Sequence, residues 1–171
     1  SIGATTFIPL VPGNYSVEVI NTMTGCSSGP DVFLINVPNE LIADPTVSTN
    51  SSCYGADDGT ASVVNPSGGT PFTVGAPYTY DWVDAITGNS IGQTTQTATA
   101  LSPGTYTCTI TDAMSCPLST TITITEPTQI NPNLTNIDVS CNGLSDGSVS
   151  VSPSGGNNAS YSFSWSNDIS N

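Results

Sequence analysis

Residues 53–69 read CYGADDGTASVVNPSGG, and residues 141–156 read CNGLSDGSVSVSPSGG. The second stretch repeats the first, and Cys141 follows Cys53 by 88 residues. Similarity of a sequence to itself at a fixed period indicates a repeated structural unit. This pair of stretches therefore predicts a chain built from similar modules, and it decides how the remaining residues are divided.

Two further pairs of stretches follow nearly the same period. LVPGNYSVEVINTMTGC (residues 10–26) returns as LSPGTYTCTITDAMSC (101–116), and YTYDW (78–82) returns as YSFSW (161–165). The spacing varies between 83 and 91 residues, as insertions in loops would make it, so one module has about 85–90 residues. We expect residues 1–44 to be the C-terminal half of one immunoglobulin-like module (strands E–G), 45–129 a complete module, and 130–171 the N-terminal half (strands A–C) of the next.

The local pattern within each module is that of short β-strands. Apolar and polar residues alternate at residues 78–82, 106–110, 122–124 and 148–151, with many β-branched and aromatic side chains. Clusters of Pro, Gly, Asn and Ser separate these runs, as turns would. No helical period extends beyond one turn. The sequence predicts an all-β chain of tandem immunoglobulin-like sandwich modules.

Particular residues favour the immunoglobulin-like topology. Trp82 and Trp165 lie where a third strand carries a core tryptophan, and Tyr15 and Tyr106 lie where a tyrosine corner opens strand F. We expect all four side chains in a core. Cys108, two residues after Tyr106, has no partner on strand B and is predicted to be a buried free thiol that packs as a small apolar side chain.

The composition excludes several classes of function. The 171 residues include no Lys, Arg or His, and 13 Asp and Glu give a net charge of −13. Binding of nucleic acid or of anionic lipid surfaces needs cationic side chains, so neither is expected. No apolar run is long enough to span a membrane, and no targeting segment is visible. The two ends have the character of cuts inside a longer protein.

The remaining four cysteines are of two recurring kinds. Cys53 and Cys141 precede strand B, whereas Cys26 and Cys116 end the turn between strands F and G. The complete module holds one of each kind, so a disulfide between Cys53 and Cys116 is expected, with Cys26 and Cys141 unpaired through truncation. In a plain sandwich these two loops lie at opposite poles, which would instead favour bridges between neighbouring modules. Either arrangement indicates an oxidising, extracytoplasmic compartment.

These stretches together resemble the SprB-type repeat of very long surface proteins in gliding Bacteroidetes. The resemblance rests on the Cys-x-Gly-x-x-Asp-Gly start, the Ser-Gly-Gly turn, the Tyr-x-(Tyr/Phe)-x-Trp strand, the Leu-x-Pro-Gly-x-Tyr strand, the Thr-Asp…Cys turn and the closing Ile-Thr-Glu-Pro. An insertion before Trp82 and the replacement of the closing motif by residues 36–38 depart from it. The resemblance implies a secreted, surface-anchored filament with adhesive or gliding-motility roles, and no enzyme.

Three chemical functions compete with a purely structural role. Asp57, Asp58 and Asp146 could act as paired carboxylates or bind Ca²⁺, but their Gly-flanked loops are more simply turns, and catalysis is not expected. Exposed aromatic residues could stack on sugars. However, the aromatic residues of 78–82 lie on one face of their strand, and so do those of 161–165. This pattern favours side chains packed in a core over an exposed platform for sugar rings.

The two ends of the chain complete one module. Residues 169–171 followed by residues 1–6 read ISNSIGATT, which matches ITGNSIGQTT at residues 86–95. We therefore expect residues 130–171 of one copy to pack against residues 1–44 of the next, either in one continuous polypeptide or by strand complementation between subunits. The predicted function is a structural segment of an extracellular filament or stalk of a bacterial surface adhesin, assembling head to tail. A carbohydrate- or surface-binding adhesive module, with glycans as partners, is the alternative.

Overall fold

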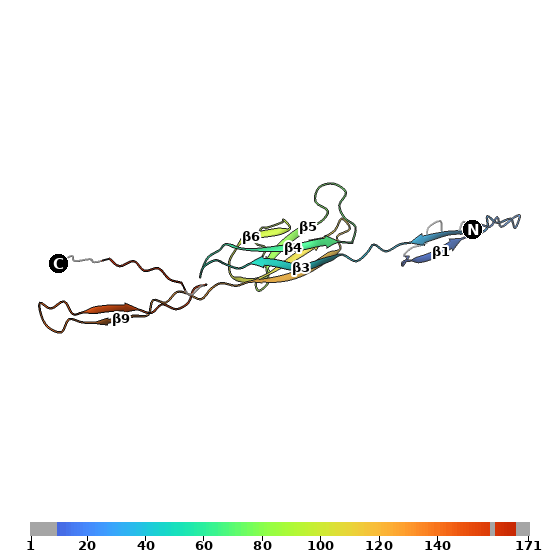
Figure 1. Ribbon diagram of the computed structural model, residues 1–171. Coiled ribbons are helices and arrows are strands. Elements are labelled where there is room, and N and C mark those ends of the chain that lie inside the picture. The colour runs from blue at the N-terminus through green and yellow to red at the C-terminus, as the bar shows by residue number, and fades with distance from the viewer. Residues whose placement is uncertain (1–9, 158–159, 167–171) are drawn as a thin grey trace.

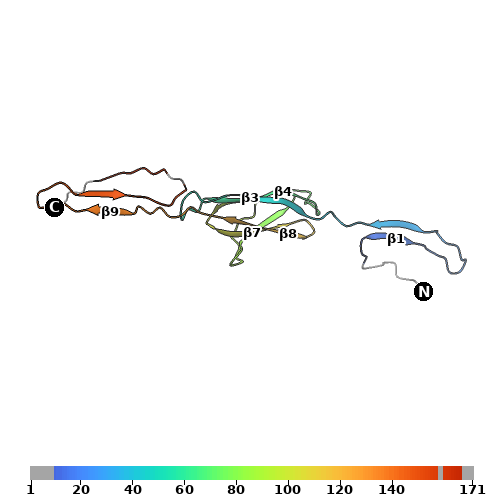
Figure 2. The same ribbon diagram turned by 60° about the horizontal axis from the view of Figure 1, so that its bottom comes forward.

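The computed structural model describes residues 10–157 and 160–166, and all regular secondary structure in this part of the chain is β-strand. Three parts follow one another along an elongated molecule (Figures 1 and 2): the head (residues 10–38), the central module (39–127) and the tail (128–166). The ten strands are β1 (Gly13–Val17), β2 (Asp31–Ile35), β3 (Ile42–Thr49), β4 (Gly59–Ser67), β5 (Thr79–Asp84), β6 (Thr97–Leu101), β7 (Gly104–Thr111), β8 (Pro117–Ile124), β9 (Leu134–Ile137) and β10 (Ser148–Val151).

The central module is a sandwich of two three-stranded antiparallel sheets. One sheet has the order β3-β4-β6 and the other β5-β7-β8. The first and last strands, β3 and β8, also lie side by side, because Ser51 N–H donates to the Thr125 carbonyl at 2.9 Å and the Thr46 hydroxyl contacts the Thr121 carbonyl at 3.5 Å. Residue numbers rise together along the two strands, from Thr46 and Thr121 to Ser51 and Thr125, so β3 and β8 run in the same direction. The prediction of all-β sandwich modules is confirmed.

The core lies between the two sheets and is built from alternate residues of each strand. Trp82 on β5 is fully buried, and its indole Nε1–H donates to the Thr95 carbonyl at 2.9 Å. Cys108 on β7 lies opposite Trp82 in the strand register and is also fully buried. Alternation of buried and exposed positions follows from the period-two geometry of strands. The other buried apolar residues are Leu41, Ala61, Val63, Tyr78, Tyr80, Ala98, Leu101, Tyr106, Ile110 and Ile124.

Tyrosine corners stand at the start of two strands. The Tyr106 hydroxyl donates to the Ser102 carbonyl at 2.9 Å, and the Tyr15 hydroxyl donates to the Val11 carbonyl at 2.8 Å. Each tyrosine reaches back four residues, which fixes the path of the chain into β7 and β1. Tyr106 is buried in the central module, whereas Tyr15 is only half-buried.

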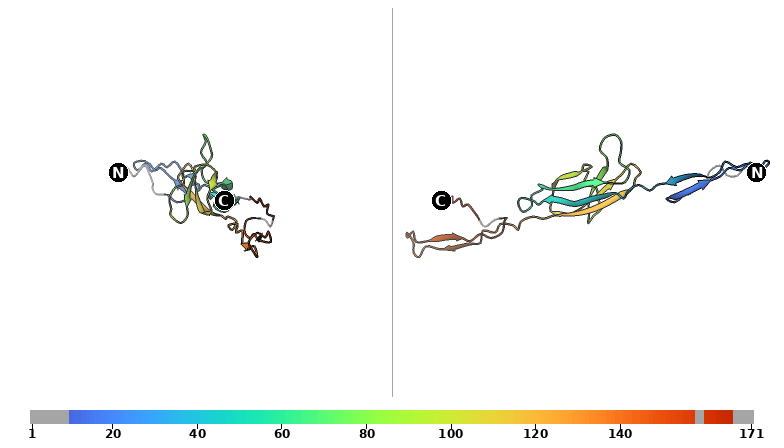
Figure 3. Two further views of the ribbon diagram at one scale, coloured as in Figure 1. Left: turned by 90° about the vertical axis from the view of Figure 1, so that its left-hand side faces the viewer. Right: turned by 45° about the vertical axis from the view of Figure 1, so that its right-hand side comes forward.

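The head and the tail each contain one isolated hairpin. In the head β1 pairs with β2, as β7 pairs with β8, and in the tail β9 pairs with β10, as β3 pairs with β4. Figure 3 shows the two hairpins beyond opposite ends of the central sandwich. A single hairpin has no second sheet to cover its apolar face.

As a result, side chains that are core in the central module are exposed in the two hairpin parts. Trp165 is 63% exposed and Phe163 is 55% exposed, although the equivalent Trp82 and Tyr80 are buried. Val17, at the position of Cys108, is 49% exposed. Trp165 therefore does not lie in a core within one copy of the chain. The predicted join between Asn171 and Ser1 falls on residues outside the described part.

Replacing Trp82 by Ala tests whether this side chain holds the sandwich together. The expected loss in the free energy of unfolding is about 3–5 kcal/mol, because a fully buried large side chain would leave a cavity between the sheets. Urea unfolding followed by circular dichroism measures the change. Trp165→Ala is the matched control and should leave the unfolding of the isolated chain nearly unchanged. A loss below about 1 kcal/mol for Trp82→Ala would contradict the assignment.

Candidate functional site

The pole at which the chain enters the central module is assembled from three segments. These are the linker residues 39–41, the Gly-Gly turn (residues 67–70) after β4, and the β7–β8 turn (residues 112–116). Gly69 N–H donates to the Asn39 carbonyl at 2.8 Å, and Ala113 N–H donates to the Thr70 carbonyl at 2.9 Å. The Gly-Gly turn therefore lies between the incoming chain and the β7–β8 turn and is bonded to both.

Asp112 joins the β7–β8 turn to the Gly-Gly turn. One carboxylate oxygen accepts the N–H of Thr70 at 2.7 Å, and the other accepts those of Met114 at 2.9 Å and Cys116 at 2.8 Å. These hydrogen bonds favour the charged carboxylate, with the Thr70 bond the largest cause, and they lower the pKa of Asp112. Gly69 has φ of +59°, and a Cβ there would meet the Asp112 carboxylate at 2.7 Å, so the turn requires glycine.

The β1–β2 turn of the head has the same local structure. The Asn21 side-chain oxygen accepts the N–H groups of Met23 at 3.0 Å and Thr24 at 3.1 Å. Asp112 likewise accepts the N–H of the second residue further on, Met114. Asn21 N–H donates to the Cys26 carbonyl at 2.8 Å, and Asp112 N–H donates to the Cys116 carbonyl at 3.2 Å. Cys26 and Cys116 therefore occupy equivalent positions in two copies of one turn.

The opposite pole, where the chain leaves the central module, is built around the β3–β4 loop (residues 50–58). Asp58 accepts the N–H of Ser52 at 2.9 Å, and Gly55 N–H donates to the Glu126 carboxylate at 2.5 Å. The β9–β10 loop of the tail repeats this arrangement, since Asp146 accepts the N–H of Ser140 at 2.9 Å. Bonds from Ser52 and Ser140 lower the pKa values of Asp58 and Asp146.

These contacts define what the predicted calcium candidates do. Asp58 and Asp146 close their own loops, and Asp57 is an exposed residue beside Asp58. In the described residues no three His, Cys, Asp or Glu side chains converge in a way that could hold a metal ion. Calcium binding stays a prediction that these contacts do not support.

The predicted disulfide between Cys53 and Cys116 is wrong for a single module. Both cysteines are free and exposed. Cys53 lies in the loop bonded to the end of β8, through Ser51 and Thr125, whereas Cys116 immediately precedes the start of β8. The nine residues from Cys116 to Thr125 span about 30 Å as a strand, far beyond the roughly 5.5–6 Å between Cα atoms that a disulfide allows. Cys26 and Cys141 are also free and exposed.

The thiol and the aromatic row that the sequence offers for chemistry in the central module are buried. Burial raises the pKa of the Cys108 thiol to about 12, so this thiol stays protonated and is a poor nucleophile. Tyr78, Tyr80 and Trp82 are buried between the sheets and offer no exposed face to a sugar ring. Within the described residues, no helix has the length and apolar character that crossing a membrane requires.

The junction between the central module and the tail contains a cavity of about 470 Å³. Ser52, Cys53 and Tyr54 of the β3–β4 loop form one wall, and the linker (127–130) together with the tail's Gly-Gly turn (154–157) and Tyr161 form the other.

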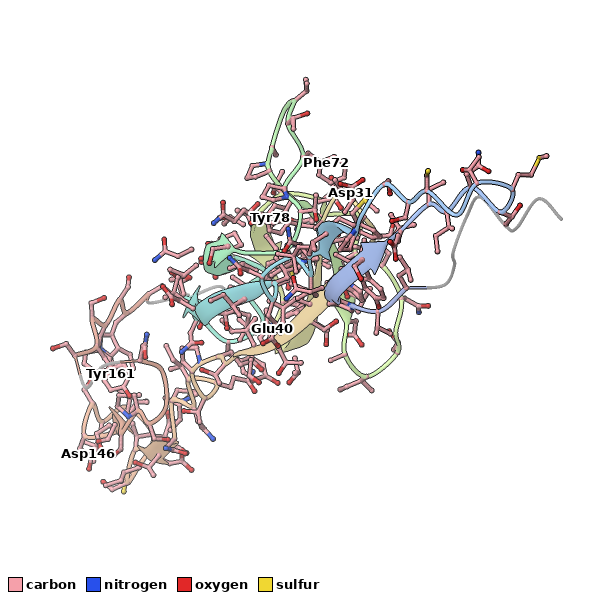
Figure 4. The ribbon with its side chains drawn as sticks, turned by 90° about the vertical axis from the view of Figure 1, so that its right-hand side faces the viewer. Asp31, Glu40, Phe72, Tyr78, Asp146 and Tyr161 are labelled. Atoms are coloured by element: carbon pink, nitrogen blue, oxygen red, sulfur yellow. The ribbon has the colours of Figure 1, made fainter. Side chains whose placement is uncertain are left out.

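The second wall repeats the entering pole of the central module. Gly156 N–H donates to the Thr128 carbonyl at 2.8 Å, as Gly69 does to Asn39. The Tyr161 hydroxyl donates to Gly155 at 2.6 Å, as that of Tyr78 does to Gly68 at 2.9 Å; both tyrosines are labelled in Figure 4.

Together, the repeated strands, loops and poles define a tandem array of β-sandwich repeat modules. The family model described as the SprB repeat matches residues 46–87 and 135–168. The first range reaches from β3 to the end of β5 in the central module, and the second contains most of β9 and all of β10 in the tail. Two segments of the chain are thus similar to the SprB repeat, and the resemblance stated from the sequence is confirmed. No curated protein and no solved structure matches the chain.

The matched family indicates a repeat of a known kind. The SprB repeat is a structural repeat of the cell-surface adhesin type and not an enzyme family. The immunoglobulin-like assignment of the modules stays a prediction.

No motif singled out from the sequence predicts the role of the residues that build the poles. Asp112 and Asn21 accept backbone N–H groups in the two turns that contain Cys116 and Cys26. The Gly-Gly turns donate backbone N–H groups to the linker that leads into the central module and into the tail. The signal was present, because TDAMSC and NTMTGC place Asp or Asn at the same distance before Met, and PSGG occurs twice. A short polar side chain that caps its own turn gives such a pattern.

Acidification tests the pole carboxylates. Since hydrogen bonds lower the pKa of Asp112 below its usual value of 3.8, its contribution to stability is present above that pH and is lost as the pH falls through the lowered value. We expect Asp112→Ala to lower the urea midpoint at pH 7, and the difference from wild type to shrink below pH 3.8. Asp57→Ala, which removes an exposed carboxylate, is the control. Equal midpoints for wild type and Asp112→Ala at pH 7 would contradict this role.

Proposed function

We propose that the chain is a structural segment of a long extracellular filament or stalk of a bacterial surface adhesin. In the filament the tail of one copy and the head of the next form one complete sandwich module. The filament's role is reach from the cell surface, and each module contacts mainly its neighbours. No catalytic step and no cofactor is part of this function.

The observation that carries the proposal is the complementarity of the two exposed half-modules. The tail supplies β9 and β10 as the equivalents of β3 and β4, and the head supplies β1 and β2 as those of β7 and β8. Residues 161–165 of the tail carry the sequence that corresponds to β5. Each half exposes the apolar face that the other half covers in the central module. Exposed faces of this kind on a secreted chain mark interaction surfaces.

The central module gives the register of the contact. Trp82 lies opposite Cys108 and Tyr80 lies opposite Ile110 in the β5–β7 pairing. By the repeat, Trp165 of one copy then lies opposite Val17 of the next, and Phe163 lies opposite Val19. Val19 is 67% exposed in the isolated chain, so the pairing would bury apolar surface on both partners.

Composition supports association through apolar surface and backbone pairing. The chain has no Lys, Arg or His, so neither head nor tail can form an ion pair between side chains of two copies. Thirteen acidic residues on every copy repel one another, and salt screens this repulsion. Assembly should therefore strengthen as the salt concentration rises.

The carbohydrate-binding alternative has less support. The aromatic rows that could form a sugar platform are buried in the central module. In the tail, the equivalent Phe163 and Trp165 are the side chains that head-to-tail packing would cover.

Substitutions on the two exposed faces test the proposal. Val17→Asp and Trp165→Glu each place a carboxylate on the contact, so both variants should remain monomeric while wild type forms elongated oligomers as its concentration increases. Analytical ultracentrifugation and electron microscopy measure the assembly. Ile86→Glu is the control, because Ile86 is 86% exposed in a loop of the central module, and this variant should assemble like wild type.

Assembly of Val17→Asp and Trp165→Glu at the wild-type concentration would overturn the proposal. Binding of wild type to a glycan array, abolished by Trp165→Glu in a chain that never oligomerises, would establish the carbohydrate-binding alternative instead.

A further inference from the structure

The four exposed cysteines lie at module poles, two at the entering pole and two at the leaving pole. Cys26 and Cys116 belong to turns at the pole where a chain enters its module. Cys53 and Cys141 belong to loops at the pole where a chain leaves, and each loop cysteine carbonyl accepts a backbone N–H from three residues further on, Ala56 or Leu144, at 3.2 Å. In a tandem array, the leaving pole of one module faces the entering pole of the next. The two kinds of cysteine therefore meet at every junction.

Cys53, at the leaving pole of the central module, lines the cavity between that module and the tail. Gly156 and Asn157 of the tail's Gly-Gly turn line it from the other side. The equivalents of Gly156 and Asn157 in the central module are Gly69 and Thr70. Thr70 binds the β7–β8 turn, through Asp112 at 2.7 Å and Ala113 at 2.9 Å.

A head that completes the tail must therefore dock its own β1–β2 turn on Asn157, beside Cys53. Within that turn the main chain of Cys26 is bonded directly to Asn21, the equivalent of Asp112. The docked turn thus brings Cys26 of the next copy to the cavity that Cys53 lines. By the same relation, Cys141 of the preceding copy comes to the entering pole that carries Cys116.

We propose that disulfides join consecutive modules across each junction: Cys53 to Cys26 of the next copy, and Cys116 to Cys141 of the preceding copy. This inference rests on the head-to-tail assembly proposed above. It gives every exposed cysteine one partner, and it leaves only the buried Cys108 as a thiol. Each bond forms when two thiols lose two protons and two electrons to a disulfide oxidant such as oxidised glutathione, which leaves as two glutathione thiols.

The test is oxidation of assembled full-length chain with oxidised glutathione, followed by a non-reducing denaturing gel. Wild type should give a ladder of covalent multimers that collapses to monomer on reduction. Because two different bridges link each pair of copies, Cys53→Ser with Cys26→Ser removes one bridge completely and should keep the ladder. Cys53→Ser with Cys116→Ser breaks both bridges and should abolish the ladder. Cys108→Ala is the control and should keep it.

Peptide mapping identifies the partners. The chain has no Lys or Arg for trypsin, so pepsin at acid pH, which also suppresses disulfide exchange, should release linked peptides containing Cys53 with Cys26 and Cys116 with Cys141. The disulfide proposal would be overturned if elongated assemblies formed while the four exposed cysteines remained open to alkylation or were linked in other pairs. The filament proposal would not be affected by that result. Chains that stay monomeric in sedimentation, reduced or oxidised, would overturn both.

Discussion

The burial of one tryptophan between two three-stranded sheets is the constraint on which each module depends. Trp82 is enclosed only because β5 pairs with β7 in its own sheet and the β3-β4-β6 sheet covers the opposite face. An isolated hairpin cannot supply both the partner strand and the covering sheet. The head has the partner strand and lacks the tryptophan, while the tail has Trp165 and lacks the partner strand. Trp165 and Val17 are exposed because, in the described residues, neither hairpin part has a second sheet to cover these side chains.

The lack of cationic side chains determines how the poles are held. Where many proteins would use an ion pair, this chain satisfies carboxylates with backbone N–H groups: Asp58 and Asp146 each close a loop, and Asp112 joins two turns. Such bonds lie within one module or between a module and its linker, so they set the geometry of the poles. They also lower the pKa values of these carboxylates, which therefore stay charged to a lower pH and would repel those of a neighbouring copy over that range.

Much of the fold could be predicted from the repeats, because residues that return at one period must occupy equivalent places. The strand positions and the burial of Trp82 followed from alternation and from the SprB resemblance. The pairing of Cys53 with Cys116 was predicted wrongly, because sequence spacing does not show which pole a loop occupies. That depends on β3 and β8 running side by side in the same direction, which is a long-range contact. Likewise, the role of Asp58 depends on Ser52, a partner that no metal motif includes.

The shared direction of β3 and β8 decides how the filament would carry tension. The chain enters a module at the start of β3 and leaves at the end of β8, so a pull on both ends shears these adjacent strands along their length.

With the proposed bridges, the covalent path can pass from β3 through Cys53 into the last strand of the next module, and from there through the linker into the first strand of the module after that. A second path runs from β8 through the linker into the first strand of the next module. It then passes through Cys141 and the bridged Cys116 into the last strand of the module after that. Two covalent rails then run the length of the filament, and strands β4 to β7 lie on neither, so tension would reach the tryptophan core only after a bridge had broken.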